Sequence, residues 1–260
     1  MCIRDSNLKG LKRNISAFNS RLSWRCHFIQ KIEDQPQIEF KSMHPAYEGI
    51  RDDFVNEFYF ESWKEGKTGF PIIDACMRSL INTGWLPFRM RAMLVSFASY
   101  NLLIDWKKSG VYLAKLFTDF EPGIHYSQMQ MQSGVTGINA IRIYNPIKQS
   151  YDQDPEGTFI RKWVDELKHI HTAYIHEPWR MNIDLQEKSK CSIGSDYPKP
   201  IIDHNKSLIF AKNLIYSVRK SKNFKENSAK VFNKLGSRKN NTPLKKIKQR
   251  ANKNQLSLID

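Results

Sequence analysis

Apolar residues recur along this chain at the three- and four-residue spacing of helices, and no segment shows the sustained alternation that is typical of a strand. Pro71 suits the first turn of a helix, where its missing N–H costs nothing, and Gly84 suits a helix end. The interval 35–50 contains Pro36, Pro45 and Gly49 and reads as a loop. The pattern predicts an all-α protein with helices over 7–34 (one helix or a pair), 52–64, 71–83, 86–108, 111–116, 158–169 and 202–220.

The predicted 86–108 helix is apolar nearly all round, which marks it as a central element, yet it carries Arg89 and Arg91. An arginine near a helical core needs an anionic partner, because an unpaired buried charge costs several kcal/mol. Asp105 lies almost four turns from Arg91 and cannot pair with it within one helix. Asp119 begins the next irregular segment and could fold back to meet Arg91. Either a protein carboxylate or an anionic ligand would satisfy the guanidinium.

Two other stretches lack a clear helical period. The interval 122–154 is rich in Gly, Gln, Asn and Pro and reads as a long irregular segment, which in a compact domain is usually functional. Residues after Ser221 have few large apolar side chains and are predicted to be disordered. The expected organisation is a helical domain over 7–220 followed by a basic tail over 221–260.

The chain has 260 residues and a net charge of +15, and this charge is unevenly placed. Residues 205–260 hold 15 lysines and arginines against two acidic residues, a net charge of +13 that leaves about +2 for the other 204 residues. Such a concentration favours binding to the phosphate backbone of DNA. A solvated tail with no partner is the alternative, and composition alone leaves both open.

Targeting signals and cysteine spacing limit where the protein works. No apolar run is long enough and free enough of charge to span a bilayer, and residues 1–6 lack the apolar centre of a signal peptide. The four cysteines form no CxxC pair. We therefore expect a cytoplasmic protein with reduced thiols and no membrane association.

Two motifs suggest chemistry that their context does not support. Gly66-Lys67-Thr68 looks like the end of a phosphate-binding loop, but Glu61 stands where the first glycine belongs and no strand precedes it. His169, His171 and His176 match no common zinc spacing and have no supporting cysteine or carboxylate cluster. We expect no metal site, and histidines at the surface or in turns.

Several blocks resemble, in order and spacing, the flavin-binding domain of the photolyase/cryptochrome family. They read TGFPIIDACMR, NTGW, RMRAM and LLIDW, and the resemblance extends over roughly residues 7–220. It implies a multi-helical FAD-binding domain that acts on damaged double-stranded DNA. It also implies an N-terminal antenna domain and a phosphate-holding Thr-Ser-x-Leu-Ser segment, neither of which occurs in this chain. We therefore expect no antenna chromophore here, and weak or absent FAD binding by this chain alone.

The resemblance also implies roles for individual residues. Arg91 and Asp119 would pair against the flavin ring, and Glu121 and Arg25 would help to line the cofactor. Trp24 and Trp85 would border the cavity for flavin and flipped base, since an aromatic wall suits stacking. Trp106 would be the middle member of an electron-relaying tryptophan chain. His125 stands near the flavin's reactive nitrogen and could donate a proton there.

The chain departs from the family pattern at other positions. Met129 falls where the flavin-proximal tryptophan of the relay is usual, and Asp53 falls where the surface tryptophan is usual. Arg21 replaces a lesion-contacting glutamate and Phe88 replaces an asparagine. Three functions therefore stay open: light-driven repair of pyrimidine dimers by a deoxyribodipyrimidine photolyase-type lyase, blue-light signalling by a non-repairing cryptochrome through an unknown protein partner, and DNA binding without flavin.

Overall fold

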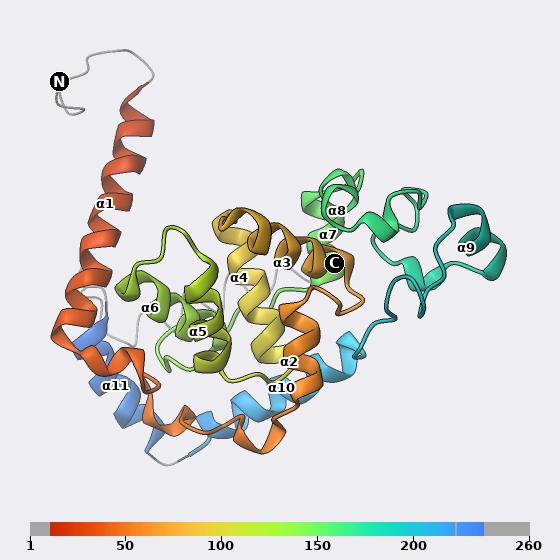
Figure 1. The fold of residues 1–260 in the computed structure, drawn as a ribbon. Coiled ribbons are helices and arrows are strands. Elements are labelled where there is room, and N and C mark those ends of the chain that lie inside the picture. Colours follow the sequence, from red (N-terminus) through yellow and green to blue (C-terminus); the bar gives the residue numbers. More distant parts are fainter. Residues whose placement is uncertain (1–10, 222, 237–260) are drawn as a thin grey trace.

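The computed structural model describes residues 11–221 and 223–236 and is built of helices (Figure 1), with one isolated bridge between Ile193 and Tyr197 in this part of the chain. The predicted all-α fold is confirmed. The α-helices are α1 Leu11–Asp34, α2 Glu57–Lys64, α3 Pro71–Thr83, α4 Phe88–Ser96, α5 Trp106–Leu116, α6 Pro122–Ser133, α7 Pro146–Gln153, α8 Thr158–Trp163, α9 Ile183–Ser189, α10 His204–Arg219 and α11 Phe224–Leu235. Short 3₁₀ turns occur at Pro36–Glu39, Pro45–Tyr47, Asp52–Phe54, Asp165–Leu167 and Pro178–Arg180.

Helices α3 and α4 form the centre of the fold. Figure 1 shows them surrounded by α2, α5, α6 and α10, with α8 and α9 extending to one side and α1 projecting from the other. Trp63 of α2 and Trp106 of α5 are fully buried in the same core. Helix α1 contains no buried residue, and its C-terminal half packs on α6.

The helix predicted over 86–108 is interrupted, and this prediction was wrong. A π-helical turn, Phe97–Asn101, follows α4, and Leu103 then takes a left-handed backbone conformation with φ of 55°. The side-chain amide of Asn101 bonds His204 Nδ1 at 3.0 Å and Ser207 Oγ at 2.8 Å. These contacts draw the turn toward α10. Asp105 then caps the start of α5 by accepting from the Lys107 N–H.

The interval 122–154 is irregular only between its two helices, α6 and α7, so this prediction was wrong over most of its length. Both helices begin with proline after a residue whose side chain accepts backbone N–H groups. Glu121 caps α6 and Asn145 caps α7. The Glu-Pro and Asn-Pro pairs were the sequence signal, and the polar composition of the helices concealed it.

Smaller corrections concern the predicted helix bounds. The 52–64 segment divides into the 3₁₀ turn Asp52–Phe54 and α2, and the 158–169 segment ends its α-helix at Trp163. Within the described residues the 7–34 segment is a single helix. The helices at 71–83 and 202–220 agree with α3 and α10 to within two residues.

Part of the predicted disordered tail forms helix α11. Its side chains Phe224, Val231 and Leu235 are buried, and they supply the apolar face that composition alone had hidden. The ring of Phe224 stacks on the buried ring of His44, with centroids 4.2 Å apart. Residues 237–260, which hold the rest of the predicted tail, lie outside the described residues.

His44 makes the docking of α11 sensitive to acid. Its Nδ1 accepts from the Ala46 N–H, so its Nε2–H donates to the Phe224 carbonyl at 3.2 Å. Burial, with a contribution from the nearby Arg219 guanidinium, lowers the pKa of His44 below its usual 6.5. The unfolded chain therefore binds a proton that the folded chain resists. The stabilising effect is present above about pH 6.5 and is lost as the pH falls.

We predict that a His44→Gln variant shows a smaller loss of stability between pH 7.5 and pH 5.5 than the unmodified chain. Urea unfolding at the two pH values measures this difference. His125 and His204, whose pKa values burial also lowers, keep part of the pH dependence in the variant. His171→Gln replaces an exposed histidine and is the control. It should lose as much stability between pH 7.5 and pH 5.5 as the unmodified chain does. An equal loss of stability in the His44 variant and in the control would contradict the role of His44 in the pH dependence.

A fully buried carboxylate joins two distant parts of the chain. Asp74 of α3 accepts from the Thr68 N–H at 2.8 Å, the Thr68 hydroxyl at 2.6 Å and the Gly69 N–H at 3.0 Å. It also accepts from the hydroxyl of Tyr197, which is fully buried as well. The segment after α9 is thereby held against the start of α3.

Within the described residues, no helix has the length and apolar character that crossing a bilayer requires.

Candidate functional site

A cavity of about 150 Å³ lies between α4, the segment 117–121 and α6. Helix α4 contributes one wall, and successive turns of α6 contribute the opposite wall. We call it the α4–α6 pocket. It is lined by Phe88, Arg91, Ala92, Val95, Phe117, Asp119, Phe120, Glu121, Ile124, His125, Gln128, Met129 and Gln132. Four predicted site residues, Arg91, Asp119, Glu121 and His125, therefore come together in one place.

Arg91 and Asp119 form a two-pronged ion pair at this pocket. The Nη1 and Nη2 atoms of Arg91 donate to the two carboxylate oxygens of Asp119 at 2.9 and 3.0 Å, and its Nε donates to the Leu86 carbonyl at 2.7 Å. The guanidinium also lies 4.2 Å from the centre of the Phe117 ring. With side-chain exposures of 23% and 51%, the pair lies at the pocket rim. The predicted pairing is present, and Arg91 is the more buried partner of the two.

Glu121 has a local structural task as well as a place in the lining. Its two carboxylate oxygens accept from the Gly123 and Ile124 N–H groups at 3.1 and 2.8 Å. A negative charge at this position also suits the positive end of the helix dipole. Glu121 thus fixes the start of α6, and with it the positions of the other α6 residues in the pocket.

His125 is held as a neutral imidazole with a defined tautomer. Burial lowers its pKa below the usual 6.5, and the Arg91 charge adds to the effect. A carbonyl can only accept, so the contact of Nε2 with the Gly110 carbonyl at 2.9 Å places the proton on Nε2. The Nδ1 atom therefore carries the free lone pair. At neutral pH this imidazole therefore offers a hydrogen-bond acceptor at Nδ1 and does not carry the extra proton that the expected donor role requires.

Trp106 does not line the pocket. Its ring is buried, and Nε1 donates to Ser42 Oγ at 3.1 Å. Met129 lines the pocket, and its side chain packs against Gly110 of α5, where an added Cβ would lie 3.3 Å from the methionine Cγ. Asp53 is exposed in the Asp52–Phe54 turn.

Three other predicted residues lie outside the pocket. Trp24 and Arg25 are exposed on α1, and Trp85 is 55% exposed just before α4. Arg21 is exposed on α1 as well, whereas Phe88 lines the pocket. The structure therefore divides the predicted site into an assembled part around Arg91 and a part on open surface.

Sequence reasoning missed the polar residues Gln128 and Gln132 of the pocket wall. They follow Glu121 and His125 at the spacing of one helix face. This signal becomes visible once α6 is recognised as a helix. Gln132 also donates to Gln128 at 3.4 Å, which orders the two amides.

Arg51, which sequence reasoning also missed, holds the far ends of both pocket walls. This fully buried guanidinium donates from Nε to the Ser99 carbonyl of the π-turn and from Nη2 to the Ser133 carbonyl at the end of α6, each at 2.8 Å. The Ser99 and Ser133 hydroxyls bond each other at 3.1 Å. Arg51 thereby fixes the spacing between the C-terminal ends of α4 and α6.

His169 and His171 are exposed, as expected, whereas His176 lies in a turn but is buried. The Nδ1 atom of His176 is 2.7 Å from Ser150 Oγ, and its Nε2 is 3.1 Å from the Pro155 carbonyl. Among the described residues no group of His, Cys, Asp and Glu is arranged to hold a metal ion.

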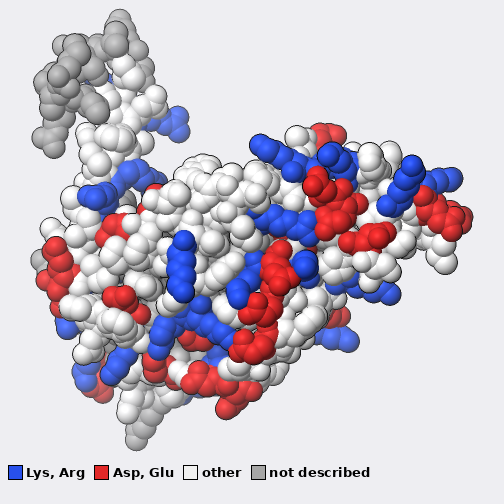
Figure 2. Space-filling model, in the orientation of Figure 1, with Lys and Arg blue, Asp and Glu red and all other residues white. Residues whose placement is uncertain are grey.

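Charged side chains are interspersed on the face that Figure 2 shows, where basic and acidic groups alternate without a patch of one sign. The excess of positive charge beyond Asn205 is carried partly by α10 and α11 and partly by residues outside the described ranges.

Comparisons with known proteins identify the family of the fold. A family model described as the FAD binding domain of DNA photolyase matches residues 18–215. A deoxyribodipyrimidine photo-lyase of Alkalihalophilus pseudofirmus is 38% identical over 197 residues, which make up 73% of this chain and 40% of the relative.

Solved structures give the same result. The crystal structure of a bacterial class III photolyase from Agrobacterium tumefaciens matches with a TM-score of 0.73 at 31% identity, covering 82% of this chain and 45% of that one. The Synechocystis cryptochrome matches with a TM-score of 0.69 at 27% identity, covering 77% of this chain and 41% of that one. The chain thus spans less than half the length of these relatives.

Proposed function

The chain belongs to the family of the FAD-binding domain of DNA photolyase, and we propose that its α4–α6 pocket holds one edge of the flavin ring. The observation that carries this proposal is the two-pronged pair of Arg91 and Asp119 at the rim of a cavity that also contains His125. A guanidinium, a carboxylate and a neutral imidazole offer the mixed donors and acceptors that the polar edge of a flavin requires.

The size of the cavity limits how much cofactor this pocket can enclose. Ligand pockets commonly measure about 300–1,000 Å³, and this one encloses about 150 Å³. The residues fit a ring edge in their chemistry, while the remainder of FAD would need contacts beyond the pocket. This agrees with the expectation that FAD binds weakly to this chain alone.

Each pocket residue has a distinct proposed task. Arg91 favours negative charge on the ligand through its guanidinium, and Asp119 orients that guanidinium while offering a carboxylate oxygen to ring-edge donors. Glu121 sets the start of α6. His125 presents an unprotonated Nδ1 and so accepts a hydrogen bond at that atom. Phe117, which is buried, keeps water from one side of the site, while Phe88 and Phe120 extend its apolar wall toward the surface.

We propose that the whole protein repairs pyrimidine dimers in double-stranded DNA. When bound, FAD would supply the electron that the dimer accepts under light. Trp24, Arg25 and Trp85 are exposed and therefore accessible to DNA. Buried Trp106 would relay electrons toward the pocket. Support comes from the relatives, which include a deoxyribodipyrimidine photo-lyase.

An absorption spectrum tests the proposed cofactor. The purified chain, and the full-length gene product, are titrated with FAD, and the bands of bound oxidised flavin and the quenching of its fluorescence are recorded. We expect saturable binding, tighter for the full-length product. Absence of binding by the full-length product would overturn the proposal. Repair of a dimer-containing oligonucleotide under blue light then tests the reaction.

A non-repairing blue-light photoreceptor is the second candidate. Met129 and Phe88 line the pocket where the family pattern has a tryptophan and an asparagine, and a cryptochrome is among the structural relatives. Flavin binding without dimer repair by the full-length product would favour this candidate. Repair activity would exclude it.

A further inference from the structure

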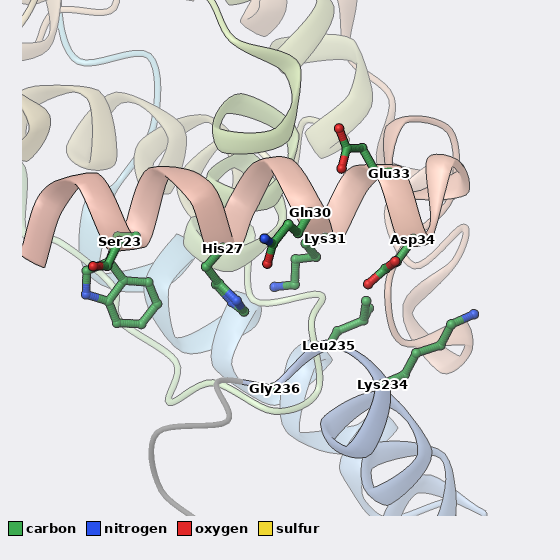
Figure 3. A pocket seen from close by; sticks show the side chains of 10 residues that line it. Ser23, His27, Gln30, Lys31, Glu33, Asp34, Lys234, Leu235 and Gly236 are labelled. Atoms are coloured by element: carbon green, nitrogen blue, oxygen red, sulfur yellow. The ribbon is translucent and has the colours of Figure 1, made fainter.

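A second cavity of about 450 Å³ lies between the C-terminal half of α1 and the end of α11 (Figure 3). We call it the α1–α11 groove. It is lined by Ser23, Trp24, His27, Gln30, Lys31, Glu33, Asp34, Lys234, Leu235 and Gly236. It shares no lining residue with the α4–α6 pocket. Its volume is within the range of about 300–1,000 Å³ that is usual for small-molecule sites.

Lys31 has an unusual environment in this groove. Figure 3 shows its side chain and that of His27 extending from α1 toward the end of α11. The ammonium group lies 5.6 Å from the centre of the Phe28 ring, and within the described part of the chain it forms no ion pair. By contrast, Lys64 is paired with Glu61 at 2.8 Å.

The surroundings of Lys31 raise the share of the neutral amine near neutral pH. Burial lowers the pKa of Lys31 from 10.5 to about 8. The charged or titratable groups that also line the groove are His27, Glu33 and Asp34 from α1 and Lys234 from α11. In Figure 3 Glu33 points away from α11 and the Lys234 amine extends outward, while Asp34 points toward Leu235. The pKa of Lys64, in contrast, is raised by its hydrogen bond to Glu61.

We propose that Lys31 is a covalent modification site that forms an imine with small aromatic aldehydes entering the α1–α11 groove. The neutral amine attacks the carbonyl carbon, a C–N bond forms, and the carbonyl oxygen leaves as water with both amine protons. No oxidant or reductant takes part. The exposed indole of Trp24 and the side chain of Leu235 give the aromatic ring of the aldehyde an apolar surface on which to pack.

Labelling with pyridoxal 5′-phosphate at pH 7.5, followed by borohydride reduction and peptide mass spectrometry, tests the site. We expect Lys31 to be labelled at least tenfold faster than Lys64 in the same molecule. Its labelling rate should rise with a midpoint near pH 8, as the amine with the lowered pKa loses its proton. Equal rates at Lys31 and Lys64 would overturn the proposal.

Matched variants separate the amine from the groove. Lys31→Arg keeps a positive charge, and its loss of the rapid labelling phase, with helicity by circular dichroism unchanged, would support Lys31 as the nucleophile. Trp24→Ala should slow labelling of Lys31 by the aromatic aldehyde but leave labelling by propanal unchanged. An equal effect of Trp24→Ala on both aldehydes would overturn the aromatic preference. A rapid phase that persists in Lys31→Arg would overturn the site itself.

Discussion

Replacing Asp74 by alanine is expected to lower the free energy of unfolding by more than about 4 kcal/mol, because four donors then lose their acceptor in the core. The donors are the N–H and hydroxyl of Thr68, the Gly69 N–H and the Tyr197 hydroxyl. Each buried donor left unsatisfied costs about 1–3 kcal/mol. A domain has only about 5–15 kcal/mol of stability in total. Urea unfolding followed by circular dichroism measures the loss.

Two further variants make this test specific. Asp74→Asn keeps one acceptor oxygen in the same place and should destabilise less than alanine does. Asp165→Ala removes a carboxylate that is 85% exposed and should change stability by less than about 1 kcal/mol. If Asp74→Ala were no more harmful than Asp165→Ala, the buried network would not hold the two chain segments together.

Replacing Arg91 by methionine is expected to weaken FAD binding at least tenfold, which corresponds to about 1.4 kcal/mol. The variant removes the guanidinium and leaves the Asp119 carboxylate unpaired beside the proposed flavin edge. Stability should fall by about 1–3 kcal/mol, because the variant also loses the hydrogen bond to the Leu86 carbonyl and the contact with the Phe117 ring. FAD titration followed by fluorescence quenching measures affinity, and urea unfolding measures stability.

Arg89 provides the matched control for Arg91. It lies two residues earlier in α4 and is exposed. Its Nη1 donates a long hydrogen bond to Gln149 Oε1 at 3.4 Å. Arg89→Met should therefore leave FAD affinity unchanged. Arg91→Lys keeps the charge without the two-pronged geometry and should give an intermediate affinity. Unchanged binding by Arg91→Met would remove the pair from the proposed cofactor site.

The sequence allowed some elements of the fold to be predicted because local signals and tertiary packing agree there. Pro71 and Gly84 delimit α3, and an apolar face defines α10. Helix α6 was missed because its stretch is polar, and its stability comes from the Glu121 cap and packing on α1, α4 and α5. The apolar face of α11 has only a few large residues and was hidden by the lysines between them.

The part of the candidate site that depends on pairing of opposite charges was predictable from the sequence. A charge argument at Arg91 identified Asp119 as a possible partner, and the structure contains that pair. The depth of the pair was not predictable, because it depends on where the 117–121 segment ends relative to α4. The tautomer of His125 depends on the Gly110 carbonyl fifteen residues away, a contact that no local pattern encodes.

The π-helical turn at Phe97–Asn101 limits where the chain can gain or lose residues. In this turn the backbone hydrogen bonds span five residues in place of four, so the turn contains one residue more than an α-helical turn. Loss of a single codon there would replace the wider turn by an ordinary α-helical one and remove the geometry from which Asn101 reaches His204 and Ser207 of α10. Asn101 would lose its hydrogen bonds to α10, and the packing of α5 against α6 would be disturbed. Insertions and deletions should therefore be tolerated near Asn139, Ala140 and Arg142, which are exposed in the connection after α6, long before they are tolerated at this turn.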